Sequence, residues 1–117
     1  MFKLLLADDD KLFLESVAAT IEGELENIET TMAFDGMDAL VKFDEIRPDI
    51  VITDHDMPHR NGTDVLNGIL KNGHTTPVIL LTGNANSVDV NLFSDVLEKP
   101  FRISDLVEVV KKHLPST

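Results

Sequence analysis

The most informative segment of the chain is Ile50-Val51-Ile52-Thr53-Asp54-His55-Asp56-Met57-Pro58. A short apolar run, rich in β-branched residues, reaches a carboxylate at Asp54, which is typical of a buried strand that ends at that residue. Pro58 cannot donate to a strand ladder, so a loop is expected there. In open α/β sheets, ligands bind outside the carboxyl ends of the strands, and Asp54 is therefore a candidate site residue.

Segments with strand character alternate with segments of helical periodicity along the whole chain. The strand candidates are residues 3–7, 28–33, 50–54, 78–82 and 96–100. Four helical stripes separate or follow them: Leu14, Val17, Ala18, Ile21 and Leu25; Met37, Leu40 and Val41, with Phe43 or Asp44 at the edge; Val65, Leu66, Ile69 and Leu70; and Ile103, Leu106, Val107, Val110 and Leu114. Asp10 is the expected N-cap of the first helix. This alternation predicts an α/β fold, a doubly wound parallel sheet with right-handed crossovers and helices on both faces.

Length and composition limit the class of protein. A chain of 117 residues is expected to form a single domain, residues 1–117. The apolar runs are too short to span a bilayer, and the start of the chain lacks the architecture of a signal peptide, so a cytoplasmic location without membrane contact is expected. With no cysteine, disulfides and thiolate metal sites are excluded. A net charge of −11 argues against nucleic-acid binding by this domain.

Four of the five predicted strands end in a polar signature. The first ends at Asp8-Asp9, the third at Asp54, the fourth at Thr82 and the fifth at Lys99. All these ends lie on one edge of a parallel sheet, where three carboxylates at close quarters raise one another's pKa. A hard divalent cation with oxygen ligands, most simply Mg²⁺, resolves this repulsion. A cation, an ammonium and a hydroxyl around a carboxylate nucleophile are the groups that phosphoryl transfer requires.

These motifs together resemble the receiver domain of two-component response regulators. The resemblance covers essentially the whole chain: an acidic pair after the first strand, T-D-x-D-M-P around Asp54, L-T-G at Thr82 and E-K-P-F at Lys99. It implies the flavodoxin-like receiver fold, a five-stranded parallel sheet in the order 2-1-3-4-5 with five helices. It also implies a signalling domain rather than an ordinary enzyme, one that catalyses only its own phosphotransfer and slow autodephosphorylation.

The resemblance implies a role for each residue that handles the phosphoryl group. Asp54 would accept it from a histidine kinase or a histidine phosphotransfer protein, as in a phosphorelay. Thr82 would move to hydrogen-bond the new group and Lys99 would pair with it. The Lys99–Pro100 peptide bond is expected to be cis, a geometry that is uncommon even before proline. Phosphorylation would then change the binding of an unknown downstream protein. A phosphorylation-dependent dimer is a further expectation.

The resemblance also implies the ligands of the Mg²⁺ cofactor. Asp9 would be the direct acidic ligand, Asp8 would act through water, and Asp54 would contribute its own carboxylate. Asp56 would contribute its backbone carbonyl, with its side chain in solvent or tuning metal affinity and dephosphorylation.

Three departures from the family concern how the signal leaves the domain. The segment from Thr82 to Lys99 is shorter than usual by more than a helical turn, so the fourth of the family's five helices is expected to be stunted or irregular. Position 96, often an aromatic switch residue in the family, is Val96, and Gly83 loosens the loop after Thr82. These features favour a hypothesis in which switching is a change of order or position in residues 83–95.

Two other functions remain as alternatives. Asp54 and Asp56 form a D-x-D motif after an apolar strand, which resembles the nucleophile and acid of haloacid-dehalogenase-like phosphatases, although those enzymes place it on their first strand. A phosphorylation-independent pseudo-receiver, a pure interaction module, is the other alternative; it is expected to have lost an acidic residue, the threonine or the lysine.

The histidines raise the question of a zinc site. His55 and His59 flank Asp54 closely enough to suggest one, but an extended segment should turn His55 away from the neighbouring carboxylates. Both are therefore expected to be exposed loop residues, and His74 and His113 are expected on the surface.

Overall fold

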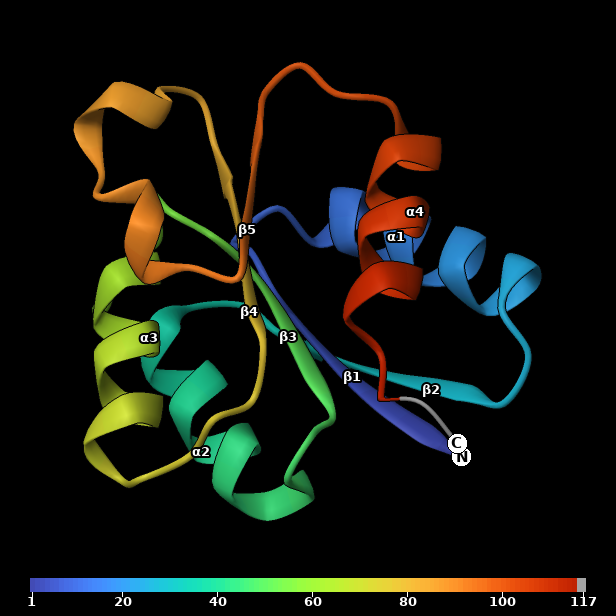
Figure 1. Ribbon diagram of the computed structural model, residues 1–117, viewed down its shortest axis with the longest axis horizontal. Helices are drawn as coiled ribbons and strands as arrows, with labels where there is room; N and C mark the ends of the chain where they lie inside the picture. Colours follow the sequence, from blue (N-terminus) through green and yellow to red (C-terminus); the bar gives the residue numbers. More distant parts are fainter. Residues whose placement is uncertain (116–117) are drawn as a thin grey trace.

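In the computed structural model, which describes residues 1–115 of the chain, five parallel strands form one sheet in the order β2-β1-β3-β4-β5 (Figure 1). The strands are β1 (Phe2–Ala7), β2 (Ile28–Ala33), β3 (Ile50–Asp54), β4 (Val78–Thr82) and β5 (Asp95–Glu98). This confirms the expected order and the parallel α/β fold. The carboxyl ends of all five strands consequently lie on one edge of the sheet.

Four α-helices within residues 1–115 cover the two faces of the sheet. They are α1 (Lys11–Glu24), α2 (Gly36–Ile46), α3 (Gly62–Lys71) and α4 (Ile103–His113). Helices α1 and α4 pack on one face, and α2 and α3 pack on the other (Figure 1). None of the helices in this part of the chain has the length and apolarity that crossing a bilayer demands.

The strands alternate their side chains between two cores. In β1, Leu4 and Leu6 join the core under α1 and α4, while Leu5 joins the core under α2 and α3. Every residue of β3 and of β4 is buried. Strands covered on both faces in this way are continuous apolar runs, which is why the sequence predicts them so clearly.

Local capping fixes where the helices begin. Asp10 caps α1 as predicted, because its Oδ1 accepts the amide of Phe13 at 3.1 Å. Asn61 and Asp64 form a reciprocal capping box at α3, with hydrogen bonds of 2.9 and 3.0 Å. The box fixes the start of α3 at Gly62, and the loop that follows Asp54 therefore ends there.

The predicted inward face of α2 is wrong at Met37 and Val41, whereas Leu40 packs on the core as predicted. Met37 and Val41 are 45% and 49% exposed, whereas Ala39 and Phe43 are buried. Two residues of a helix subtend about 200°, so burying Ala39 and Phe43 turns Met37 and Val41 outward. Leu70 of α3, also predicted to point inward, is 50% exposed.

The segment between β4 and β5 contains two short 3₁₀ helices, η1 (Ala85–Ser87) and η2 (Val90–Leu92). The expected stunted, irregular helix is thus found where the family has its fourth α-helix, and residues 1–115 contain four α-helices instead of five. Strand β5 starts one residue earlier than predicted and ends at Glu98 instead of Pro100.

Candidate functional site

A pocket of about 480 Å³ lies at the carboxyl edge of the sheet, over the ends of β1, β3 and β5. Its polar lining comprises Asp8, Asp9, Asp10, Asp54 and Lys99, and its apolar lining comprises Phe13, Pro100, Phe101 and Ile103. The pocket therefore joins three of the predicted strand ends in one place. Thr82, at the end of β4, is not part of its lining.

Three carboxylates converge in this pocket. One oxygen from each of Asp8, Asp9 and Asp54 lies within 4.8 Å of the other two. Asp8 and Asp54 are only 3% and 5% exposed, while Asp9 is exposed. Burial raises the pKa of Asp8 to about 6, although the backbone amide of Asp10 opposes this by donating a hydrogen bond to it at 3.0 Å. The negative charge of Asp54 adds to the rise.

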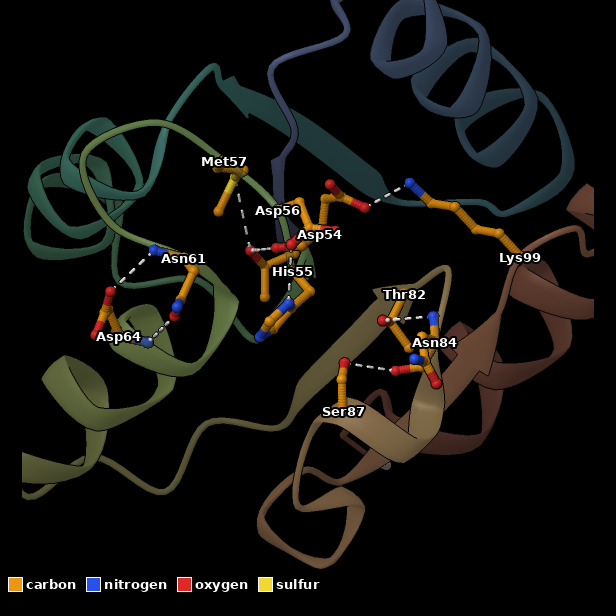
Figure 2. Close-up of polar contacts among 11 residues, drawn as sticks. Asp54, His55, Asp56, Met57, Asn61, Asp64, Thr82, Asn84, Ser87 and Lys99 are labelled. Carbon is orange, nitrogen blue, oxygen red and sulfur yellow. Dashed lines mark hydrogen bonds and ion pairs between the residues drawn. The ribbon is translucent and has the colours of Figure 1, made fainter.

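Lys99 is the cation of the pocket. Its Nζ lies 2.5 Å from Oδ1 of Asp54 (Figure 2). Burial by itself lowers the pKa of Lys99, but the hydrogen bond to Asp54 and the charge of that carboxylate outweigh this effect and raise the pKa. The Lys99 amide donates to the carbonyl of Thr82 at 2.7 Å, and the Lys99–Pro100 bond is cis as predicted.

Thr82 is buried on the strand beside Asp54, with 2% of its surface exposed. Its Oγ1 accepts the backbone amide of Asn84 at 3.1 Å (Figure 2). The hydroxyl is thus engaged with the start of the following loop, on the strand adjacent to β3. This hydrogen bond connects the end of β4 directly to the segment that contains η1 and η2.

Asp56 lies apart from the three clustered carboxylates. Its side chain is 89% exposed, and its Oδ1 is 3.2 Å from Nδ1 of His55 (Figure 2). The side chain of His55 is only 17% exposed. The expectations that His55 would be exposed and would point away from Asp56 are therefore wrong, because the loop after Asp54 curls instead of remaining extended.

Comparison with known proteins identifies the family. A family model described as the response regulator receiver domain matches residues 4–111. The chain belongs to the response regulator receiver domain family. Such a domain is a signalling module of two-component systems. Receiver domains generally bind Mg²⁺ at an acidic pocket, and the carboxylate cluster of this chain lies in such a pocket.

Individual relatives agree with this assignment. DNA-binding response regulator MtrA of Mycolicibacterium paratuberculosis is 33% identical over 117 residues, which cover 96% of this chain and 51% of MtrA. Transcriptional regulatory protein CpxR of Escherichia coli is 34% identical over 116 residues, covering 95% of this chain and 48% of CpxR. The chain thus spans about half the length of the curated relatives it matches.

Solved structures give the same result. The receiver domain of Francisella response regulator 1452 is 31% identical with a TM-score of 0.85, and the alignment covers 96% of this chain and 95% of that one. Chemotaxis response regulator CheY4 of Vibrio cholerae is 26% identical with a TM-score of 0.85, covering 97% and 99% of the two chains.

The other histidines of the receiver domain are less exposed than predicted, apart from His59. The ring of His74 packs against Phe43 with 5.1 Å between centroids, and its Nε2 is 2.6 Å from Nη1 of Arg47. His113 is partly buried, with Nε2 3.1 Å from Oδ2 of Asp95. Both rings are partly exposed at the surface, and each also packs against a neighbouring element.

Asp95 connects β5 to α4 through its contacts with His113 and Lys112, whose Nζ is 3.6 Å away. Burial by itself raises the pKa of Asp95, but hydrogen bonds from His113 and from the amide of Val96 outweigh it and hold the pKa below its ordinary value. The last helix of the receiver domain is therefore attached to the edge strand by charge as well as by apolar packing.

Sequence reasoning missed the apolar wall of the pocket. Phe13 packs edge-on against Phe101 at 6.3 Å, and its ring lies 5.9 Å from Nζ of Lys99. The available signal was the position of Phe13 in the first turn of α1, directly after the acidic run that caps this helix.

Proposed function

We propose that Asp54 is the phosphoacceptor of this receiver domain and takes a phosphoryl group from a histidine kinase or a histidine phosphotransfer protein. The observation that carries the proposal is the convergence of three carboxylates with Lys99, 2.5 Å from Asp54, in one pocket. A carboxylate oxygen of Asp54 forms a bond to phosphorus as the phosphorus–nitrogen bond of the donor breaks. The donor's imidazole nitrogen retains that bonding electron pair, and an acyl phosphate results.

The donor set supports Mg²⁺ as the cofactor. The clustered groups of Asp8, Asp9 and Asp54 are all carboxylate oxygens, which hard cations prefer, and two of the three are buried. We assign Asp9 and Asp54 as direct ligands, Asp8 as a ligand through water, and Asp56 as a ligand through its backbone carbonyl. When bound, Mg²⁺ would neutralise negative charge on the phosphoryl oxygens.

Lys99 and Thr82 handle the phosphoryl group once it is present. Lys99 holds a full positive charge beside Asp54, and that charge can follow the phosphoryl oxygens because 39% of its side chain is exposed. Thr82 exchanges its hydrogen bond from Asn84 for one to the phosphoryl group. This exchange would transmit phosphorylation to the segment after β4 and change the binding of a partner protein or of a second receiver domain.

The two alternative functions are not favoured. A phosphatase of the haloacid-dehalogenase type needs the second carboxylate of its D-x-D motif beside the first, whereas the Asp56 side chain is 89% exposed and lies next to His55. A pseudo-receiver is expected to lack a site residue, whereas the acidic pair, Asp54, Thr82 and Lys99 are all present.

The test is phosphorylation by acetyl phosphate with Mg²⁺, followed by intact-mass spectrometry because the chain has no tryptophan to report binding. The wild-type protein should gain one phosphoryl group, and Asp54→Asn should gain none. The matched control is Asp56→Asn, which removes a carboxylate two residues away but outside the cluster, and which should still be phosphorylated. Equal, persistent phosphorylation of Asp54→Asn would refute the assignment.

A further inference from the structure

Helix α2 has a second apolar face that the domain itself does not cover. Met37 and Val41 are one turn apart on this face and are 45% and 49% exposed. Phe34, just before the helix, is 37% exposed. The opposite face buries Ala39 and Phe43 in the core. The apolar residues on the outer face therefore do not contribute to the core, and their role must be sought on the surface.

Met37 and Val41 border a hollow. A depression of about 540 Å³ is lined by Asp35, Met37, Asp38, Val41 and His59, and we call it the Met37 groove. It lies between the first half of α2 and the loop that joins β3 to α3. That loop packs closely on the helix, because a Cβ atom at Gly36 would lie 2.0 Å from the carbonyl oxygen of Arg60. The wall of the groove is thus held by backbone contact.

Acidic residues dominate the polar part of this face. Asp35 and Asp38 line the groove itself, and Asp44 and Glu45 follow on the same helix. Lys42 is the one basic residue of α2, and its ammonium is engaged by the carbonyl of Met32 at 2.6 Å and by Asp38 at 3.1 Å. An apolar strip beside carboxylates complements a helix with apolar residues on one side and Lys or Arg at its borders.

The Met37 groove is separate from the site at the carboxyl edge. The groove and the pocket around Asp54 share no lining residue. A partner held in the groove therefore leaves the carboxylate cluster accessible, so docking and phosphotransfer can take place on the same molecule at the same time.

We propose that the Met37 groove is a docking site for a basic amphipathic helix of a partner protein. Apolar residues one turn apart on the partner pack on Met37 and Val41, and its flanking cations face Asp35 and Asp38. A second copy of this chain fits less well, because two domains of net charge −11 repel each other. The docking helix does not need phosphorylated Asp54, so this proposal stands or falls independently of the proposed function.

The probe is a synthetic helical peptide of roughly 15 residues, with leucines along one face and lysines beside them. It should bind with amide shifts concentrated in residues 34–41 and at His59. A peptide of the same composition with the leucines spread around the helix should bind more weakly by about tenfold. Added salt should weaken binding of the first peptide, because the cations contribute to it.

The decisive variant is Met37→Ser with Val41→Ser, which removes the apolar strip without touching the core. It should weaken peptide binding by about tenfold, whereas the control Leu70→Ser, at an equally exposed leucine of α3, should leave it unchanged. Shifts spread over the whole acidic surface, with no effect of the double variant, would overturn the proposal. Concentration-dependent dimerisation that the double variant abolishes would also overturn it, in favour of a second copy of the chain.

Discussion

The carboxyl edge of β1 and β3 contrasts with the segment that joins β4 to β5. Asp8 and Asp54 extend from strands whose final residues are buried, and they are 3% and 5% exposed. Between Gly83 and Ser94, Phe93 is the one buried residue, and Val90 and Leu92 are 41% and 49% exposed. The carboxylate cluster thus lies on the buried part of the sheet, whereas the neighbouring segment has little apolar burial to hold it.

Local polar contacts shape this weakly buried segment. The Asn84 side chain accepts the amide of Asn86 at 3.0 Å, the Ser87 hydroxyl donates to the Asn84 carbonyl at 2.8 Å, and Asp89 accepts from Asn91 at 3.1 Å. Such hydrogen bonds span two or three residues and can form in many loop conformations. The contrast supports the proposed mechanism, in which a fixed acceptor site would act through Thr82 on an adjustable segment, residues 83–95.

The largest expected effect is on stability. Ile79→Ala in β4 should lower the free energy of unfolding by about 3 kcal/mol, because it leaves a cavity at a fully buried position. Leu92→Ala in the weakly buried segment should change it by about 0.5 kcal/mol or less. Urea denaturation of both variants measures the difference. Similar losses in the two variants would remove the contrast between the regions.

The second prediction concerns metal affinity and pH. Because the pKa of Asp8 is about 6, this carboxyl is largely protonated at pH 5 and cannot help to hold a cation. Affinity for Mg²⁺ should therefore fall about tenfold between pH 7.5 and pH 5. Isothermal titration at several pH values measures it. In Asp8→Asn, affinity should be weaker throughout and depend less on pH; an unchanged pH profile would exclude Asp8 as the cause.

Without a bound metal, the carboxyl of Asp8 should also make the free energy of unfolding depend on pH. The folded pKa of Asp8 lies above its ordinary value of 3.8, so its contribution is complete below that pH and is lost as pH rises through about 6. With chelator present, the domain should therefore lose this contribution between pH 4 and pH 7. Added Mg²⁺ should restore stability at pH 7. In Asp8→Asn, the stability should depend less on pH between pH 4 and pH 7, and added Mg²⁺ should restore less of it.

The fourth prediction concerns the segment between β4 and β5. A beryllofluoride mimic of the phosphoryl group should slow amide exchange by about fivefold across Gly83 to Asp95, because its hydrogen bond to Thr82 favours one arrangement of this segment. Hydrogen exchange with and without the mimic gives the answer residue by residue. Equal protection of the segment in both states, with changes in α1 or α4 instead, would show that the signal leaves by another route.

The smallest expected effect is that of Lys99→Ala on the metal. Lys99 pairs with Asp54 but supplies no ligand oxygen, so Mg²⁺ affinity should stay within about threefold of wild type. The phosphorylated or beryllofluoride-bound conformation should be populated less. Metal titration and amide exchange on one sample separate the two effects, and a large loss of Mg²⁺ affinity would contradict this division of roles.

Most of the fold follows from patterns that the sequence displays openly. Strands β3 and β4 are continuous apolar runs that end at Asp54 and Thr82, and the acidic pair after β1 marks the same edge. Because parallel strands bring their carboxyl ends together, the carboxylate cluster and the nearby lysine were predictable without coordinates.

The features that the sequence did not predict depend on tertiary packing, which the periodicity of apolar residues does not determine. Helix α2 offers two apolar stripes, and only packing against the sheet and the contact of Gly36 with Arg60 select the one that contains Phe43. The position of His55 depends on the backbone of its neighbours, because its amide donates to the carbonyl of Leu81 and its carbonyl accepts the amide of Gly62, each at 2.9 Å. The buried face of α2 and the position of His55 both depend on contacts between segments that are far apart in the sequence.

The edge strand β5 affects whether the domain aggregates at high concentration. Strand β5 has four residues and carries carboxylates at both ends, with Asp95 next to His113 and Glu98 accepting the amide of Ala85 at 2.8 Å. A strand this short, flanked by charge and side-chain contacts, is a poor template for a strand of another molecule. The edge of the sheet beside the segment between β4 and β5 is thereby protected against edge-to-edge aggregation.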